Sequence, residues 1–245
     1  MIYDLISDYK KIINESASKT ILSLEEIFKD INIDKNKEFV HQITKFFMAM
    51  EIWSRKITEK NSDTNLEKLM KNILLNYCSI LNCLILGDEK VIKFLYRNII
   101  ESILRAITLN FNTKDIEGLF KNISNSCTTV KEKELIQTYL SVLKSIYDDT
   151  CLYVHTDVSK IPHNLNNLVK YNINSKTLKV DKLLNDFNNL NICMLCILLI
   201  KYYDLYTSFK SNARGFIDEI IPLSKRVQIS HFIEEKRSDD ISVNK

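Results

Sequence analysis

The stretch NLEKLMKNILLNYCSILNCLILGDEKVIKFLYRNIIESILRAITLNF, residues 65–111, holds two apolar helical patterns that are divided by a single glycine. Apolar residues recur at intervals of three and four on both sides of Gly87, which is the spacing of one face of an α-helix. Asn65 is a suitable N-cap for the first helix, and Gly87 occupies the position expected at a helix C-terminus. Asp88 starts the second helix, whose first turn carries acids that suit the positive end of the helix dipole. The stretch therefore predicts two consecutive helices.

The composition extends this helical prediction to the whole chain. Among 245 residues there are only 3 glycines and 2 prolines, too few for the tight turns that sheets and α/β folds require. With 45% hydrophobic and 27% charged residues, the chain is ordinary globular material and is long enough to bury a sizeable core. We therefore predict an all-α fold, a multi-helix bundle.

Further helices are predicted on both sides of this pair by the same periodicity. One region differs, because Val169, Tyr171 and Ile173 alternate with polar residues and the sequence NSKT follows as a plausible turn. That alternation predicts a small β-hairpin over residues 168–180. The other predicted helices cover about residues 2–16, 24–31, 37–58, 115–122, 131–155 and 181–209, with one more short helix before Pro222.

The chain has no internal repeat and no low-complexity linker, so a single domain is the economical interpretation. Within it we distinguish an N-terminal helical part, residues 1–87, and a second helical bundle, residues 88–233. The last stretch, EEKRSDDISVNK at residues 234–245, is mostly polar, and we expect it to be a flexible tail.

Charge and hydropathy narrow the classes of function and location. The formal net charge is only +3, and basic residues are interleaved with acids along most of the chain, so the charge neither demands nor excludes RNA as a partner. The start MIYDLISDYKK has acids at Asp4 and Asp8 and no apolar signal region. The apolar run Ile192–Ile200 is too short to cross a bilayer. We therefore expect a cytoplasmic protein with no membrane partner.

Motifs of the common enzyme and metal-binding classes are absent from the sequence. There is no glycine-rich phosphate loop, no GxSxG and no HExxH, and the four histidines lie in unrelated segments. Cys193 and Cys196 form a CxxC, but it lies in an apolar helix without a second pair at zinc spacing, which favours core packing. We expect the six cysteines to be reduced and buried, and we predict no metal and no cofactor.

A polar stripe interrupts the second helix of the opening stretch. Arg97, Glu101 and Arg105 recur at intervals of four, and at 100° per residue they share an arc of about 80° with Asn98 beside them. One interpretation is a solvent-exposed face, where each ion pair contributes only a few tenths of a kcal/mol. The other is a phosphate ligand, because a carboxylate can hold arginine forks in one orientation.

A histidine closes the predicted helix 131–155, in the stretch YDDTCLYVHT at residues 147–156. His155 falls at the edge of the apolar arc that contains Tyr147, beside the polar stripe of Asp148. A histidine in a last helical turn interacts favourably with the negative helix end, and this alone can explain it. The alternative is a general acid or base, since the pKa of imidazole lies nearest neutrality.

These two helices carry a resemblance to a known superfamily. FLYRNIIESILRAI (residues 94–107) and YLSVLKSIYDDTCLYVHT (residues 139–156), followed by a loop or hairpin and one more apolar helix, resemble the HEPN superfamily of small helical bundles. The resemblance covers about residues 90–210. It implies a metal-independent endoribonuclease of a bacterial toxin, abortive-infection or other antiviral defence system, acting on RNA as a homodimer.

The sequence departs from the pattern of this superfamily at one point. Typical active members carry an arginine four to six residues before the histidine on the same helix, whereas residues 149–154 contain no arginine. The resemblance therefore implies either an inactive relative or an active one that takes its cation from the neighbouring helix. In the active form His155 is the acid or base, and Arg97 or Arg105 stabilises charge on the phosphate.

Three hypotheses follow for the function. The first is the endoribonuclease, and the second is an inactive helical module that binds a protein partner or antitoxin. The third is a sensor of a nucleotide or other small ligand in the same polar cleft. The predicted catalytic residues are His155, Arg97, Glu101 and Arg105, and the predicted substrate-binding residues are Asn98, Tyr147 and Asp148.

Overall fold

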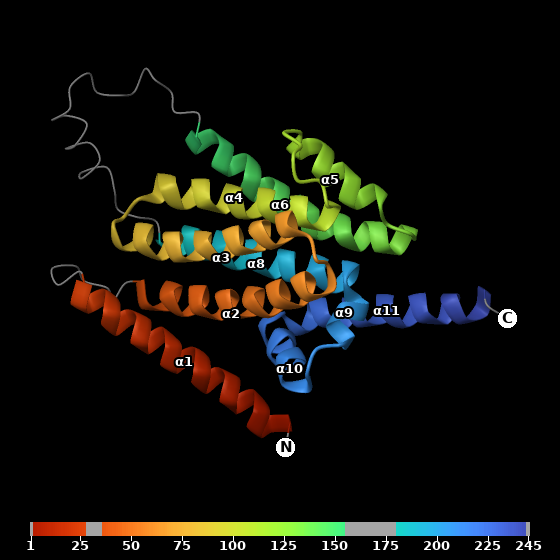
Figure 1. Ribbon diagram of the computed structural model, residues 1–245, viewed down its shortest axis with the longest axis horizontal. Helices are drawn as coiled ribbons and strands as arrows, with labels where there is room; N and C mark the ends of the chain where they lie inside the picture. Colours follow the sequence, from red (N-terminus) through yellow and green to blue (C-terminus); the bar gives the residue numbers. More distant parts are fainter. Residues whose placement is uncertain (1, 28–35, 155–179, 244–245) are drawn as a thin grey trace.

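The computed structural model describes residues 2–27, 36–154 and 180–243, and within these ranges every regular element is an α-helix (Figure 1). The prediction of an all-α, multi-helix fold is confirmed. The predicted β-hairpin lies outside the described residues, except that Val180 begins a helix. The helices are α1 (Ile2–Ile27), α2 (Lys37–Lys60), α3 (Thr64–Ile85), α4 (Glu89–Thr108), α5 (Ile116–Asn125), α6 (Val130–Val154), α8 (Val180–Lys201), α9 (Tyr203–Thr207), α10 (Ser211–Ile220) and α11 (Leu223–Val243).

The helix pair of the opening stretch, α3 and α4, is bounded by specific caps. Asp63 caps α3 in place of the predicted Asn65, because its carboxylate accepts a hydrogen bond from the backbone N–H of Asn65 at 2.7 Å. Gly87 has a φ of +67°, which a residue without a Cβ adopts at little cost. The N–H of Asp88 donates to the carbonyl of Cys83 at 2.9 Å, which closes α3 in a Schellman motif. The helix α4 begins after Asp88, at the predicted place, and the Asp88 side chain caps it.

The N-terminal segment is one helix rather than two. The predicted helices at residues 2–16 and 24–31 are joined in α1, which is continuous as far as Ile27. The residues between them include no glycine or proline, and Thr20 Oγ1 donates to the carbonyl of Ser16 at 2.9 Å inside the helix. Because the polar side chain bonds within its own helix, the polar stretch does not interrupt it.

The predicted helix 181–209 is divided into α8 and α9. The backbone of Tyr202 leaves helical values, with φ −123° and ψ 38°. Beyond this break Tyr206 stacks on Trp53, with ring centroids 6.4 Å apart, and Phe209 meets the same indole edge-on at 4.9 Å. The break therefore accompanies aromatic packing against α2, a tertiary contact that helical periodicity does not reveal.

The C-terminal range 234–245, expected to be a flexible tail, is mostly helical backbone. The helix α11 begins after Pro222 and continues to Val243. The segment EEKRSDD consists of residues that tolerate or favour a helix, and Glu235 forms an ion pair with Lys131 of α6 at 2.9 Å. Polarity alone thus did not indicate where the last helix ends.

One hydrophobic core joins the helices on both sides of Gly87. Phe187 of α8 is fully buried, and its ring centroid lies 5.3 Å from that of Phe39, 5.7 Å from Tyr77 and 5.9 Å from Tyr96. These partners come from α2, α3 and α4, which Figure 1 shows side by side. The N-terminal helical part and the second bundle of the sequence prediction therefore share their core.

The central helix α8 is long and apolar enough to cross a membrane by composition alone. However, 67% of its apolar window is buried inside the structure, where α8 packs on α4, α6 and α11. Its buried Asn191 accepts from the hydroxyl of Tyr77 and donates to the carbonyl of Phe187 at 2.7 Å. Burial in the bundle explains the apolar composition of this helix.

The cysteines divide by burial. Cys193 and Cys196 are buried in α8 as predicted, and burial raises the pKa of Cys193 to about 11 and that of Cys196 to about 12. Both thiols therefore stay protonated at neutral pH and act as core side chains. The expectation that the cysteines are buried fails for Cys78, which is exposed on α3. It holds only in part for three half-buried cysteines, Cys83, Cys127 and Cys151.

The helix α4 ends at a residue with a left-handed backbone conformation. Leu109 has a φ of +52°, is 55% exposed, and follows the last turn that carries Arg105. A left-handed conformation costs a non-glycine residue about 1 kcal/mol. We expect Leu109→Gly to raise the free energy of unfolding by about 0.5–1 kcal/mol in urea titrations, and Leu109→Ala to give no such gain. A loss of stability in Leu109→Gly would contradict this.

Candidate functional site

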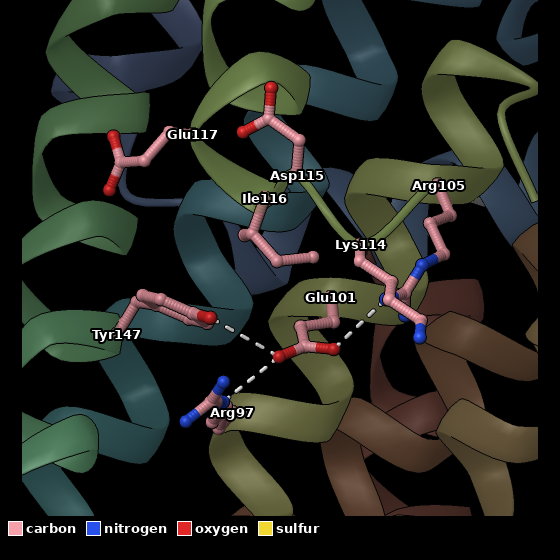
Figure 2. Close-up of a pocket in the computed structure, with 8 residues that line it drawn as sticks. All are labelled: Arg97, Glu101, Arg105, Lys114, Asp115, Ile116, Glu117 and Tyr147. Carbon is pink, nitrogen blue, oxygen red and sulfur yellow. Dashed lines mark hydrogen bonds and ion pairs between the residues drawn. The ribbon is translucent and has the colours of Figure 1, made fainter. Parts of the chain in front are cut away.

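An open pocket of about 390 Å³ lies between α4, α5 and α6 (Figure 2). Its walls come from the outer face of α4, from the first turn of α5 and the loop before it, and from the middle of α6. Polar and charged side chains therefore meet from three segments that are distant in sequence. The lining residues are Arg97, Glu101, Arg105, Lys114, Asp115, Ile116, Glu117 and Tyr147.

Glu101 lies at the centre of this pocket and holds two arginines. Its Oε1 accepts a hydrogen bond from Arg97 Nε at 2.9 Å, and its Oε2 accepts from Arg105 Nη2 at 3.1 Å. The three side chains are 16–25% exposed, so they are half-buried and do not form the solvent-exposed face that was one interpretation of the stripe. Half-buried ion pairs hold their side chains in one orientation better than exposed ion pairs do.

Tyr147 of α6 joins the same network from the opposite wall. Its hydroxyl donates to Glu101 Oε1 at 3.2 Å, and the guanidinium of Arg97 lies over its ring, 5.0 Å from the centroid. Burial, reinforced by the charge of Glu101, raises the pKa of Tyr147 to about 12, so the phenol stays protonated at neutral pH. The hydrogen bond to Glu101 raises the pKa of Arg97, which keeps its charge.

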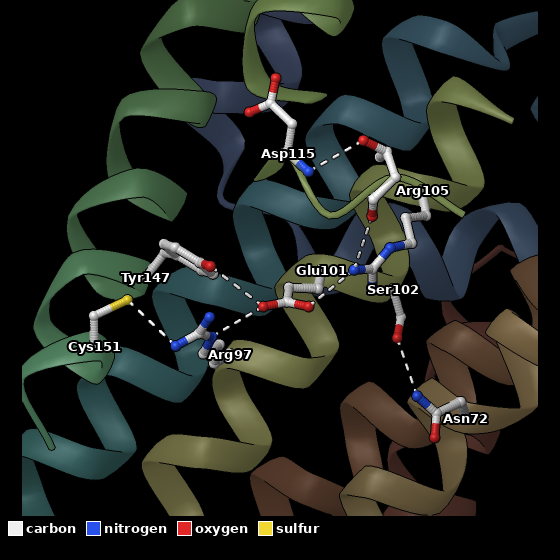
Figure 3. Close-up of polar contacts among 9 residues, drawn as sticks. Asn72, Arg97, Glu101, Ser102, Arg105, Asp115, Tyr147 and Cys151 are labelled. Carbon is white, nitrogen blue, oxygen red and sulfur yellow. Dashed lines mark hydrogen bonds and ion pairs between the residues drawn. The ribbon is translucent and has the colours of Figure 1, made fainter. Parts of the chain in front are cut away.

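Weaker contacts hold the outer parts of both guanidinium groups (Figure 3). Arg97 Nη1 lies 3.6 Å from Cys151 Sγ, and Arg105 Nη2 also donates to the carbonyl of Thr113 at 3.4 Å. Each guanidinium retains N–H groups that have no partner in the described part of the chain. Both arginines are thus oriented by the protein and keep donors for a ligand.

The first turn of α5 closes the pocket. Asp115 caps this helix by accepting from the N–H of Gly118 at 2.8 Å, and its own N–H donates to Thr113 Oγ1 at 3.1 Å. A Cβ at position 118 would collide with the Asp115 carboxylate, so a larger residue there would displace the capping side chain. Within residues 36–154 and the other described ranges, the N–H groups of Ile116 and Glu117 have no acceptor, as is usual at a helix N-terminus.

Formal charges balance around the pocket, but the carboxylates are already engaged. Glu101 binds two arginines, Asp115 caps α5, and Glu117 is paired with Lys144. Lys114, by contrast, is exposed and forms no ion pair with any described residue. The groups with unused hydrogen-bonding capacity are therefore mainly donors, which suits an anionic ligand.

The structure brings together four of the seven predicted site residues. Arg97, Glu101, Arg105 and Tyr147 share the pocket, whereas Asn98 and Asp148 do not line it. Asp148 is 56% exposed and pairs with Lys144 at 2.6 Å. One position along a helix turns a side chain by about 100°, so the neighbours of Arg97 and Tyr147 point elsewhere. His155 lies outside the described residues.

Sequence reasoning missed the contribution of residues 114–117. The start of a short helix was predicted at this place, and Asp115 does cap it. The periodicity of one segment does not show against which other helix it folds, so the pairing of this turn with the α4 stripe was not foreseen. The local signal was a lysine directly before a helix cap, and it is a weak one.

Comparison of the chain with protein-family models, with curated proteins and with solved structures gave no match.

Proposed function

We propose that the pocket binds a phosphodiester of RNA and that the protein is a HEPN-like, metal-independent endoribonuclease of a bacterial toxin or antiviral defence system. One observation carries this proposal: a single carboxylate, Glu101, fixes two arginines at the wall of an open pocket and leaves them N–H donors. Oriented guanidinium groups bind phosphate oxygens in pairs and stabilise charge that develops there.

Each residue has a role in this proposal. Arg97 and Arg105 contact the scissile phosphate while the adjacent 2′-hydroxyl attacks phosphorus and the 5′-oxygen of the next nucleotide leaves, and they stabilise the developing negative charge. Glu101 and Tyr147 act through the arginines as positioning residues. His155 is the general acid or base that the resemblance implies, and its proximity to the arginines is part of the proposal.

The test is cleavage of a labelled RNA by the purified full chain in EDTA. We expect products that end in a 2′,3′-cyclic phosphate, and we expect Arg97→Gln to slow cleavage about tenfold or more. The matched control is Arg55→Gln, because Arg55 also pairs with a glutamate four residues away but is 71% exposed on α2. Light scattering on the same samples tests the proposed homodimer.

The outcomes separate the hypotheses. Equal cleavage by Arg97→Gln and Arg55→Gln proteins of unchanged thermal stability would exclude the pocket from catalysis. Intact RNA after incubation with the wild-type chain would contradict the enzyme and favour the interaction module. Cleavage that requires a divalent metal would contradict the metal-independent mechanism.

A further inference from the structure

A second pocket, of about 330 Å³, lies where α10 meets α11. It shares no residue with the first pocket, and Figure 1 shows α10 and α11 on the other side of α3 and α8 from α5. Asp218 of α10 forms one wall, and a single face of α11 forms the rest. The residues from α11 are Leu223, Arg226, Val227, Ser230, His231 and Glu234.

This face of α11 is set by helical spacing. The residues that line the pocket recur at intervals of three and four, so they form one continuous stripe. Ile229, Phe232 and Ile233 lie between them in sequence and are buried in the core. Core packing of these three residues therefore holds the stripe in a fixed orientation toward the pocket.

Arg226 is a half-buried cation that lines this pocket. Its Nε is buried and has no hydrogen-bond partner, and no ion pair joins Arg226 to any residue in the described ranges. Asp218 is close enough to act on it electrostatically, but the Asp218 carboxylate accepts from the hydroxyl of Tyr206 at 2.6 Å instead. The guanidinium of Arg226 is therefore a lining group without an ion pair in the described ranges, and an anion in the pocket could pair with it.

The other lining groups indicate which kind of anion fits. Ser230 and His231 add a hydroxyl and an imidazole beside the guanidinium, a set of donors that suits phosphate oxygens. Leu223 and Val227 are 66% and 44% exposed in the same pocket, and they offer an apolar surface for a flat ring. The carboxylates of Asp218 and Glu234 oppose a highly charged ligand such as a triphosphate.

We propose that this pocket binds a small phosphorylated molecule with a flat apolar group, namely a nucleoside monophosphate. Arg226, His231 and Ser230 contact the phosphate, and Leu223 and Val227 contact the base. The proposal is independent of RNA cleavage in the first pocket, because it concerns binding of a small ligand and is measured without any RNA.

The test is titration calorimetry of the full chain with each of the four ribonucleoside monophosphates, with ATP and with inorganic phosphate. We expect at least one monophosphate to bind more tightly than both ATP and phosphate. We expect Arg226→Gln and His231→Asn each to weaken that binding about tenfold. Arg55→Gln, which removes the same charge on α2, should leave it unchanged. His231 is exposed, so its variant reports on binding even if Arg226→Gln affects folding.

Three results would overturn the proposal. The first is that the wild-type chain binds none of the four monophosphates. The second is that Arg226→Gln and His231→Asn proteins bind them as the wild type does. The third is loss of RNA cleavage in both variants, because Arg226 and His231 lie five positions apart on one helix, which is the spacing of arginine and histidine in active HEPN members. The pocket would then be a reacting centre, and the ligand assignment would fail.

Discussion

Replacement of Lys93 by methionine is expected to lower the free energy of unfolding by about 3 kcal/mol. The side chain of Lys93 is 1% exposed, and its Nζ lies 2.7 Å from Asp149 Oδ2 and 4.0 Å from Glu89 Oε1. Methionine fills a similar volume, so the loss arises from the carboxylates. Without the ammonium group, Asp149 loses its nearest cation in a partly buried site, where burial and the charges of Asp149 and Glu89 raise the pKa of Asp186.

Lys182 provides the matched control. It contacts the same Asp149 Oδ2 at 3.3 Å, but it is 49% exposed. Exposed pairs contribute little, so Lys182→Met should cost less than about 1 kcal/mol in the same urea titration. Equal losses in the two variants, or a loss below 1 kcal/mol for Lys93→Met, would show that burial of this lysine is not what makes the pair important.

The effect of Lys93→Met should depend on pH in a defined direction. Burial raises the pKa of Asp149, but hydrogen bonds and charges from Lys93 and Lys182 outweigh burial and hold it below its ordinary value. A lowered pKa stabilises the fold above the pKa of the unfolded state, about 4, and this contribution is lost as pH falls. The difference between wild type and Lys93→Met should therefore be largest near neutral pH and shrink below about pH 4.

The burial of Lys93 could not be predicted from the sequence. It continues the row of charges at intervals of four that contains Arg97, Glu101 and Arg105. A helix has 3.6 residues per turn, so each step of four rotates the row by about 40°, and Lys93 lies about 120° from Arg105. The row thus passes from the half-buried pocket into the contact of α4 with α6 and α8. The sequence showed the row, but only the packing of three helices decides which end is buried.

The helices and their boundaries were largely predictable because their causes are local. Apolar periodicity located α2, α3, α4 and α6, and the turn at Gly87 was recognised from one residue type with one conformational advantage. The candidate pocket was predictable only along α4. Tyr147 was included because of the family resemblance. Lys114 was missed, because no local rule states that the first turn of α5 folds against the outer face of α4.

The Glu101→Gln variant is expected to show that Glu101 acts by orienting Arg97 and Arg105 and not through its negative charge alone. This prediction rests on the proposed endoribonuclease activity. We expect cleavage to slow about a hundredfold, because an amide cannot hold Arg97 and Arg105 with two charge-assisted hydrogen bonds. RNA binding should not weaken. Removal of a negative charge leaves the pocket more cationic, so fluorescence anisotropy should show equal or tighter binding with a steeper dependence on salt.

Glu117→Gln is the control that decides between the two explanations, since it removes the same charge from the same pocket. Glu117 is 58% exposed and pairs with Lys144, not with either arginine. If Glu101 acts by orienting the guanidinium groups, Glu117→Gln should retain cleavage within about threefold while showing a similar gain in RNA binding. Equal losses of cleavage in both variants would mean that the balance of charge matters and the orientation does not. Full cleavage by the Glu101→Gln protein would mean that the arginines do not need their carboxylate. The fixation of two arginines by Glu101, on which the proposed function rests, would then play no part in catalysis.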